Sequence, residues 1–488
     1  METFLIRALQ LILCFSILIA LHEGGHFLAA RIFKMRVERF YLFFNPWFHI
    51  ASTYDTWVRR LLRKKPVVVP EEEYTDEKGN VQKRHKYVGT EYGLGWLPLG
   101  GYVSIAGMID ETSNKEDLKK PVEDWEFRAK PAWQRLIVMV AGVFVNFITA
   151  LVIYAMVLFT WGDTYVPIEK MSNGLKFNER AMKLGFQDGD IPLRTETTAF
   201  TRFDDSQSIG DVYRAISEAQ QVTVLRNGKE VTLQLPGEIN MLEMMKEQPP
   251  FMIALAPSII DSVEAGTPAA KAGITKGDRI VAFCGEPIST WNEYTDKTAR
   301  LQDMLTADNA DSMKIRTITL AVERKSGEVD TLQTTLTPEL LLGVKWTPPL
   351  TTYETRTTEY GFFESFPAGI TYGWNVLSGY VRDLKYIFTA DGAKSVGSFG
   401  AIGSLFPATW DWQRFWEMTA FISLMLAFMN ILPIPALDGG HAFFLVCEVI
   451  TRRKPSDRFM EIAERIGITL LLILMAYALF NDFMRFLF

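Results

Sequence analysis

The sequence predicts an α-helical polytopic membrane protein with about four transmembrane helices, a re-entrant β-hairpin, and two α+β domains inserted between the second and third helices. Three observations support this fold class. Apolar segments of bilayer-spanning length occur at residues 1–34, 131–161, 413–450 and 460–488. A Gly- and Pro-containing apolar region at 91–103 cannot form a regular helix. The more polar stretch from 165 to 345 contains an internal repeat.

Composition sets the outer limits of the interpretation. The 488 residues are sufficient for about three domains. The formal net charge of −6 gives no indication of a nucleic-acid partner. Two of the three cysteines, Cys14 and Cys447, lie in apolar segments and Cys284 lies in a polar one, so neither a disulfide framework nor a thiolate zinc site is predicted.

The first apolar segment, 1–34, carries the strongest chemical signal in the chain. Its middle is interrupted by His22-Glu-Gly-Gly-His26. An ionisable residue near the centre of a transmembrane helix costs about 2.5–3.5 kcal/mol, so a functional role is the default expectation. His22 and His26 are four residues apart and therefore share one helical face, where both imidazoles can bind one cation, with Glu23 placed to take a proton from metal-bound water. The pattern predicts a zinc protease.

Two other interpretations of this motif compete with a zinc site. A pattern with three fixed positions arises by chance in soluble helices, but in lipid an exposed polar face has no water to satisfy it. A secretory signal peptide requires a basic amino-terminal region and a small-residue cleavage site. Here Glu2 partly offsets Arg7, and the motif itself follows the apolar run.

Residues 35–130 are predicted to be a cytoplasmic insertion with a membrane-associated β-loop. Lys34, Arg36 and Arg39 follow the first helix, and basic residues near a membrane end favour the cytoplasmic side. The basic run 59–65 and the acidic run 71–73 indicate a solvated insertion. The stretch 91–103 is expected to form a β-hairpin or re-entrant loop that dips toward the first helix, since non-helical backbone at that depth must be buried or line a watery cavity.

The second transmembrane helix is predicted at 131–161. Gly142 is expected to allow close helix packing, and the Asn146 amide is able to hydrogen-bond across to a neighbouring helix.

The repeat predicts two domains, at 165–245 and 250–345. Ala181-Met-Lys-Leu-Gly-Phe-Gln-Asp-Gly-Asp190 is similar to Ala269-Ala-Lys-Ala-Gly-Ile-Thr-Lys-Gly-Asp278, which lies 88 residues later. Each copy is followed by alternating apolar residues around a turn, at 222–235 and 318–332, which indicates a β-hairpin. This pattern resembles the PDZ family, more closely in the second copy, and the resemblance implies domains of a fold that binds extended peptides by strand addition.

The remaining segments complete the predicted topology. Residues 359–412 contain apolar side chains at helical spacing and are expected to lie along the membrane surface or against the helix bundle. The third helix, 413–450, contains Asn430-Ile-Leu-Pro-Ile-Pro-Ala-Leu-Asp-Gly-Gly-His441, and the fourth spans 460–488. Four basic residues between them, in the stretch 452–458, place this connection on the cytoplasmic side.

A catalytic zinc normally has three protein ligands and one open position. Asp438 is the predicted third ligand because it is flanked by glycines and by two prolines that unwind the helix, and because topology places it at a depth similar to that of the histidines. His441 is a competing ligand. His49 and His85 lie in the polar insertion and are expected to be surface residues.

Taken together, these motifs resemble the site-2 protease family over nearly the full chain. The resemblance is carried by His22-Glu-Gly-Gly-His26, by Trp96-Leu-Pro-Leu-Gly-Gly-Tyr-Val103, by the segments 127–135 and 142–146, by the two PDZ-like repeats and by the 430–441 segment. It implies a multi-pass zinc metalloendopeptidase of the bacterial inner membrane, with one Zn²⁺ held by His22, His26 and Asp438, Glu23 as the catalytic base, and Asn430 as a substrate-binding residue.

The same resemblance implies a substrate class and an orientation. The expected substrates are single-pass transmembrane proteins, such as anti-sigma factors or remnant signal peptides, cleaved after another protease has trimmed them. The active site is expected near the cytoplasmic side and the PDZ-like domains on the periplasmic side. The rival hypotheses are an inactive PDZ membrane scaffold and a lipid-directed zinc hydrolase; zinc content and the effect of losing Glu23 test the scaffold hypothesis, and the peptide-binding repeats argue against the lipid hydrolase.

Overall fold

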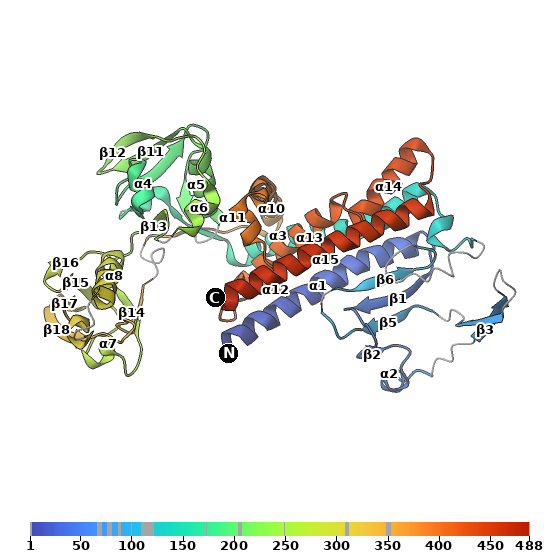
Figure 1. Ribbon diagram of the computed structural model, residues 1–488, viewed down its shortest axis with the longest axis horizontal. Helices are drawn as coiled ribbons and strands as arrows, with labels where there is room; N and C mark the ends of the chain where they lie inside the picture. The colour runs from blue at the N-terminus through green and yellow to red at the C-terminus, as the bar shows by residue number, and fades with distance from the viewer. Residues whose placement is uncertain are drawn as a thin grey trace. The chain divides into compact units, whose positions relative to one another are not determined.

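The computed structural model describes residues 2–65, 71–75, 81–85, 89–98, 100–108, 122–171, 173–203, 207–247, 249–307, 312–347 and 353–487 (Figure 1). The chain divides into two compact units. The first combines Met1–Gly162 with Glu359–Phe488, and the second is Asp163–Thr358.

The first unit is mainly helical. Its long helices are α1 (Glu2–Ile32), α3 (Ala132–Trp161), α10 (Phe362–Asp383), α13 (Trp412–Ile431), α14 (Asp438–Thr451) and α15 (Asp457–Leu487). Among the described residues, three stretches are long and apolar enough to cross a membrane: Thr3–Ile32, Ala132–Trp161 and Arg458–Met484. The chain is therefore an integral membrane protein, as predicted.

The third apolar segment, 413–450, forms two helices, and the break between them falls in the proline-containing stretch that was expected to unwind it. The helix α13 ends at Ile431 and α14 begins at Asp438. Pro433 and Pro435 lie in the connection, where each lacks the backbone N–H that a continuing helix would need. Ala436 has a φ of 75°, which a regular right-handed helix cannot contain. The two helices then follow α3 in the same direction, since Ser423 of α13 contacts Asn146 and Glu448 of α14 contacts Arg135.

The helix α3 forms the centre of the unit, with α1, α10, α13 and α14 packed against it. Small residues permit these approaches. A Cβ atom added at Gly25 of α1 would lie 2.7 Å from the carbonyl oxygen of Ala141. One added at Gly142 of α3 would lie 2.3 Å from Nε2 of His26. Gly142 therefore has the packing role expected from the sequence, and it places α3 directly against the histidines.

The helix α10 contacts α3 through small residues and through part of its apolar face, which includes Tyr372, Val376 and Leu377. Gly369 and Gly373 are buried, and a Cβ atom added at Gly369 would lie 2.6 Å from the backbone nitrogen of Ala155. Phe363 and Trp374 are 84% and 64% exposed. The helix α10 thus packs against the helix bundle, one of the two positions expected for 359–412, and leaves Phe363 and Trp374 exposed.

A four-stranded sheet lies beside α1, with β1 (Val37–Leu42) and β6 (Tyr102–Ile105) in contact with the helix (Figure 1). The strand order is β2-β5-β1-β6, where β2 is Ala51–Ser52 and β5 is Glu91–Leu94. The strand β1 is parallel to β5 and antiparallel to β6. The predicted hairpin within 91–103 is therefore wrong: its two strands are separated by β1, which comes from a distant part of the sequence.

The predicted approach of this loop to the first helix is observed. A Cβ atom added at Gly101 would lie 2.7 Å from Cγ2 of Ile19 and 3.5 Å from Cγ of Glu23. The next residues form β6, which is an edge strand of the sheet among the described residues. This edge lies beside the part of α1 that contains the histidine motif.

The first unit also contains several shorter elements. They are α2 (Thr56–Leu61), the hairpin of β3 (Glu71–Thr75) and β4 (Val81–His85), and the short helices η2 (Phe127–Ala129), η5 (Leu384–Phe388), α11 (Ala390–Ser395) and α12 (Phe399–Ser404).

The second unit begins and ends on neighbouring strands. The strand β7 (Asp163–Pro167) pairs on one side with β10 (Arg202–Phe203) and on the other with β20 (Arg356–Thr358). Asp163 is the pairing partner of Thr358. The two ends of the inserted unit are therefore adjacent.

The first half of this unit contains the sheet β12-β11-β9 and the pair β13-β8. Its elements are β8 (Leu175–Phe177), α4 (Glu179–Lys183), β9 (Ile191–Thr195), α5 (Gln207–Glu218), β11 (Gln221–Arg226), β12 (Lys229–Gln234), α6 (Met241–Lys246) and β13 (Met252–Ala254). The predicted hairpin at 222–235 is formed by β11 and β12, and Asn227 and Gly228 at its turn both have positive φ.

The second half contains the sheet β16-β15-β17-β18 and the pair β14-β19. Its elements are β14 (Ile260–Val263), α7 (Pro268–Lys271), β15 (Arg279–Phe283), β16 (Glu286–Pro287), α8 (Trp291–Ala307), α9 (Ser312–Arg316), β17 (Thr317–Glu323), β18 (Val329–Thr335) and β19 (Val344–Trp346). The predicted hairpin at 318–332 is formed by β17 and β18. The boundary expected near residue 250 lies later, because β13 pairs with β8 of the first half.

The repeated motif forms the same local structure in both halves. Asp190 is fully buried and accepts hydrogen bonds from the backbone N–H of Gln187 at 2.9 Å and from the guanidinium of Arg226 at 2.6 and 2.7 Å. Asp278 is 2% exposed and accepts from the backbone N–H of Thr275 at 2.8 Å and from Arg324 at 2.7 Å.

The glycines of the repeat have a conformational role. Gly185 and Gly273 have φ values of 98° and 74°, in a region that residues with a Cβ atom rarely adopt. Each carbonyl also accepts a hydrogen bond at 2.8 Å from the same arginine that binds the buried aspartate. Each ten-residue motif thus forms a turn that is linked to the following sheet by one ion pair of a buried aspartate, Asp190 with Arg226 or Asp278 with Arg324.

Candidate active site

The two histidines of the motif lie on one face of the uninterrupted helix α1. Their Nε2 atoms are 3.3 Å apart. Nδ1 of His26 lies 2.8 Å from the carbonyl oxygen of Val138 on α3. In the neutral imidazole, an Nδ1–H that donates to this carbonyl leaves the lone pair of Nε2 free to bind a metal.

Asp438 completes this cluster from the other end of the chain. Its Oδ2 atom lies 3.1 Å from Nε2 of His22 and 3.3 Å from Nε2 of His26. Potential ligand atoms of the three residues all lie within 4.8 Å of one another. The structure therefore brings together the three ligands expected from the sequence.

The connection between α13 and α14 determines where Asp438 lies. Asp438 is the first residue of α14, directly after the proline-containing break. A Cβ atom added at Gly439 would lie 2.3 Å from the carbonyl oxygen of Leu432, and one added at Gly440 would lie 2.4 Å from that of Ile434. Both glycines are needed because the preceding backbone folds tightly against the start of the helix.

The donor set fits a divalent cation such as zinc. Two imidazole nitrogens and one carboxylate oxygen are ligands that zinc binds in catalytic sites. Oδ2 of Asp438 is buried and has no hydrogen-bond donor. Lone pairs therefore converge at this point, and a bound cation would satisfy them.

Glu23 lies in the same cavity as the cluster. The cavity has a volume of about 220 Å³ and is lined by residues from α1, α3, α14, α15 and the sheet. Its walls include His22, Glu23, His26, Asp438, Tyr102, Val103 and Ile105. Glu23 is thus placed beside the three ligands and beside the edge strand β6.

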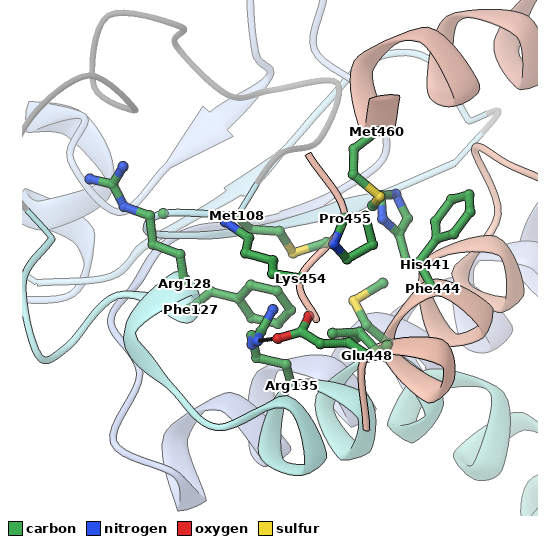
Figure 2. Close-up of a pocket in the computed structure, with 13 residues that line it drawn as sticks. Met108, Phe127, Arg128, Arg135, His441, Phe444, Glu448, Lys454, Pro455 and Met460 are labelled. Carbon is green, nitrogen blue, oxygen red and sulfur yellow. Dashed lines mark hydrogen bonds and ion pairs between the residues drawn. The ribbon is translucent and has the colours of Figure 1, made fainter. Parts of the chain in front are cut away.

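The remaining candidate residues lie outside the cluster. His441 lines the cavity but does not belong to the cluster of His22, His26 and Asp438. Figure 2 shows its ring beside Pro455 and Met460. Asn430 lies in the last turn of α13 and is not among the described residues that line the cavity. His49 lies 3.0 Å from Asp55. The side chain of His85 is outside the described residues.

Comparison with known proteins decides the family. A sequence profile of Peptidase family M50 matches residues 10–58 and 79–474, which is most of the chain. The chain belongs to peptidase family M50. The predicted resemblance to the site-2 protease family and the predicted enzyme class, a zinc metalloprotease, are therefore confirmed.

Several curated relatives align with this M50 peptidase over nearly its full length. Regulator of sigma-E protease RseP of Escherichia coli is 28% identical over 519 residues, covering 99% of this chain and all of the relative. Protease RseP of Yersinia pestis is 28% identical, with 97% of each chain covered. A Neisseria meningitidis protein named as a zinc metalloprotease is 25% identical, with 98% of this chain and 99% of the relative covered.

The M50 site contains a residue whose relation to His22 the sequence did not reveal. Asn146 of α3 is 1% exposed, and its amide nitrogen lies 3.3 Å from Nδ1 of His22. Its Oδ1 atom is buried without a hydrogen-bond partner. An amide turned by 180° occupies the same space, satisfies that oxygen through the Nδ1–H of His22, and leaves Nε2 free for a metal.

The sequence indicates only one of the two groups that contact the histidines from α3. Asn146 was recognised as an amide able to bond across helices, but its partner depends on how α3 packs on α1. The Val138 carbonyl that contacts His26 is a backbone group and leaves no signal in the residue types. Close helix packing at Gly25 and Gly142 brings α3 near enough for both contacts.

Proposed function

We propose that this chain is an intramembrane zinc endopeptidase that cleaves single-pass transmembrane proteins after another protease has trimmed them. The observation that carries the proposal is the convergence of His22, His26 and Asp438 beside Glu23. The two histidines and Glu23 lie on a helix that is apolar enough to cross a bilayer, and polar residues at such a position favour catalysis within the membrane.

His22, His26 and Asp438 would hold one zinc ion. When bound there, zinc supplies Lewis-acid polarisation of the scissile carbonyl and a nucleophilic water at neutral pH. The hydrogen bonds of His26 to Val138 and of His22 to the Asn146 amide orient the two imidazoles.

Glu23 acts as the general base and then as the general acid. Its carboxylate takes a proton from the attacking water and transfers it to the leaving amine. Its position next to His22, in the cavity lined by the metal-binding group, supports this role. Asn430 is proposed as a substrate-binding residue on the strength of the family resemblance.

The substrate must unwind before it is cut, because a helix keeps its carbonyl groups in internal hydrogen bonds. The edge strand β6 offers backbone groups to an extended segment, and three of its residues, Tyr102, Val103 and Ile105, line the cavity. Addition of a substrate strand along this edge would present a peptide bond to Glu23. An extended stretch of transmembrane sequence fits this arrangement.

The inserted unit 163–358 is proposed to contain two PDZ-like domains that restrict access. The basic residues after α1 and those around 452–458 place both of these segments on the cytoplasmic side of a bacterial inner membrane, so the segment between them lies outside. Domains tethered at both ends would exclude substrates with large exported regions and admit trimmed ones, such as anti-sigma factors or remnant signal peptides.

The experiment compares the full-length wild type with Glu23→Gln, each reconstituted in liposomes with a trimmed single-pass substrate. We expect cleavage by the wild type, none by the variant, and equal zinc content in both. If the wild type contains zinc and Glu23→Gln cleaves equally well, the proposal fails. An inactive PDZ membrane scaffold, the alternative, would bind partners without cleavage in either form.

A further inference from the structure

A second cavity adjoins the one that contains Glu23. Its volume is about 70 Å³, several times the roughly 10–15 Å³ that one water needs. Met108, Met139 and His441 line both cavities. The two spaces therefore share a wall, and Figure 2 shows the second cavity between the loop at Met108 and Phe127 on one side and α14 on the other.

The surface of this second cavity is mainly apolar. Phe127, Phe444, Leu445 and Met460 contribute large apolar side chains to it. Lys454 also lines this cavity. The two arginines at its edge are paired: Arg135 lies 2.5 Å from Glu448 and also donates to the carbonyl of Lys130 at 2.9 Å, and Arg128 forms an ion pair with Glu126. A polar substrate group that entered this cavity would lose its hydrogen bonds to water. The paired arginines already have partners, so they would not replace those bonds, and binding of a polar group is therefore unfavourable.

The path of the backbone connects the two cavities. Tyr102, Val103 and Ile105 of β6 line the first, and Gly107 and Met108, which follow directly, line the second. An extended chain advances about 3.3 Å per residue. A substrate strand paired along β6 would therefore pass from one cavity to the other within about three residues.

We propose that the second cavity is a specificity subsite that accepts one large apolar side chain of the substrate, such as Leu, Met or Phe, within three residues of the scissile bond. This inference rests on the proposed function, and it adds a sequence preference that the proposed function does not contain. Transmembrane segments are rich in such residues, and the apolar lining selects them over polar ones.

The test uses neighbouring phenylalanines of α14. Phe444 lines the cavity, whereas Phe443 is 51% exposed and does not line it in the described structure. Full-length wild type, Phe444→Ala and the matched control Phe443→Ala are assayed on transmembrane substrates that carry Ala, Leu or Trp at each of the three positions on either side of the cut. Met460→Trp, which narrows the cavity, serves as a second and opposite variant. Zinc content is measured for every variant as a check on folding.

At one substrate position we expect Phe444→Ala to raise the ratio of kcat/KM for Trp over Leu by about tenfold or more, because the enlarged subsite accepts a larger side chain. Met460→Trp should lower kcat/KM for Leu relative to Ala at that same position, and Phe443→Ala should change neither ratio. If Phe444→Ala loses its zinc, Met460→Trp decides the question.

Ratios that stay at the wild-type value at all six positions would overturn the subsite, and so would an equal shift in Phe443→Ala. These outcomes differ from failure of the proposed function. Unchanged ratios in an enzyme that depends on Glu23 reject the subsite alone, whereas cleavage that survives Glu23→Gln rejects the proposed function.

Discussion

Oδ2 of Asp438 lies 3.1 Å from Nε2 of His22, although the two residues are near opposite ends of the chain. The contact joins the first transmembrane helix to the start of α14. The contact depends on the break between α13 and α14, because this break makes Asp438 the first residue of a new helix. The metal-binding group therefore requires the folded first unit, and its properties provide direct tests of the assignment.

The first prediction concerns metal content. His22→Ala combined with His26→Ala should remove zinc from the purified protein, because two of three ligands are lost. His441→Ala should retain it, since His441 lies outside the metal-binding group. Elemental analysis of each protein gives the zinc per chain. Stoichiometric zinc in the double variant would refute the ligand assignment.

The second prediction concerns Glu23. Glu23→Gln should lower kcat by at least about 10²-fold while zinc content is kept, because the amide has nearly the same shape but cannot accept a proton. Single-turnover cleavage of a reconstituted substrate measures the loss. Activity within tenfold of wild type would exclude Glu23 as the base.

The third prediction concerns Asn146. Asn146→Ala should weaken zinc binding by about 10- to 100-fold through loss of the group that orients His22. Asn146→Asp should retain most of the affinity, because a carboxylate also accepts the Nδ1–H of His22. Competition with a chelator of known affinity measures the change.

Ser423→Ala is the control for Asn146. Its hydroxyl donates to the backbone carbonyl of Asn146 at 2.7 Å, so its loss changes the same helix contact without touching the side-chain amide. Equal zinc affinity in Asn146→Ala and in wild type would show that the amide does not position His22.

The fourth prediction concerns the repeated ion pair. Asp278→Ala should lower the opening free energy of the β15–β17 region by about 1–3 kcal/mol, because the backbone N–H of Thr275 and the Arg324 guanidinium lose a buried acceptor, although Arg324 keeps Asp330. Asp261→Ala is the control: its pair with Lys276 is solvent-exposed and should contribute at most about 1 kcal/mol. Native-state hydrogen exchange of β17 in the full chain measures both. Similar exchange in the two variants would contradict a structural role for the motif.

The fifth prediction concerns the inserted unit. Because Asp163 pairs with Thr358, residues 163–358 can be replaced by a short Gly–Ser linker without separating α3 from α10. The shortened chain should keep its zinc and cleave substrates that still carry their exported regions. A shortened chain that binds zinc and cuts only trimmed substrates would refute the filtering role.

The orientation of that unit is tested separately. Cys284 is exposed and Cys14 is buried, so a membrane-impermeant thiol reagent should reach Cys284 from outside intact inner-membrane vesicles of right-side-out orientation. Labelling that occurs only after the cytoplasmic face is opened would place the unit on the opposite side.

The sequence by itself determined the features that depend on local spacing and residue type. His22 and His26 share a face because any α-helix places residues four apart together, and an apolar helix makes their polarity exceptional. Asp438 could be inferred because glycines and prolines around a lone acid indicate a break in the third apolar segment. The two β-hairpins of the inserted unit followed from alternation and from the Asn227-Gly228 turn.

Tertiary structure decided the features that depend on contacts between distant segments. β1 lies between β5 and β6 because strand pairing joins residues that are far apart in sequence. A local hairpin pattern cannot show that a third strand is inserted between its two strands. Asn146 meets His22 because glycines let α3 approach α1, and Val138 contributes a carbonyl that any residue type would carry. The cavity beside the candidate active site is likewise formed by segments from four regions of the chain, so its shape exists only after those segments pack together.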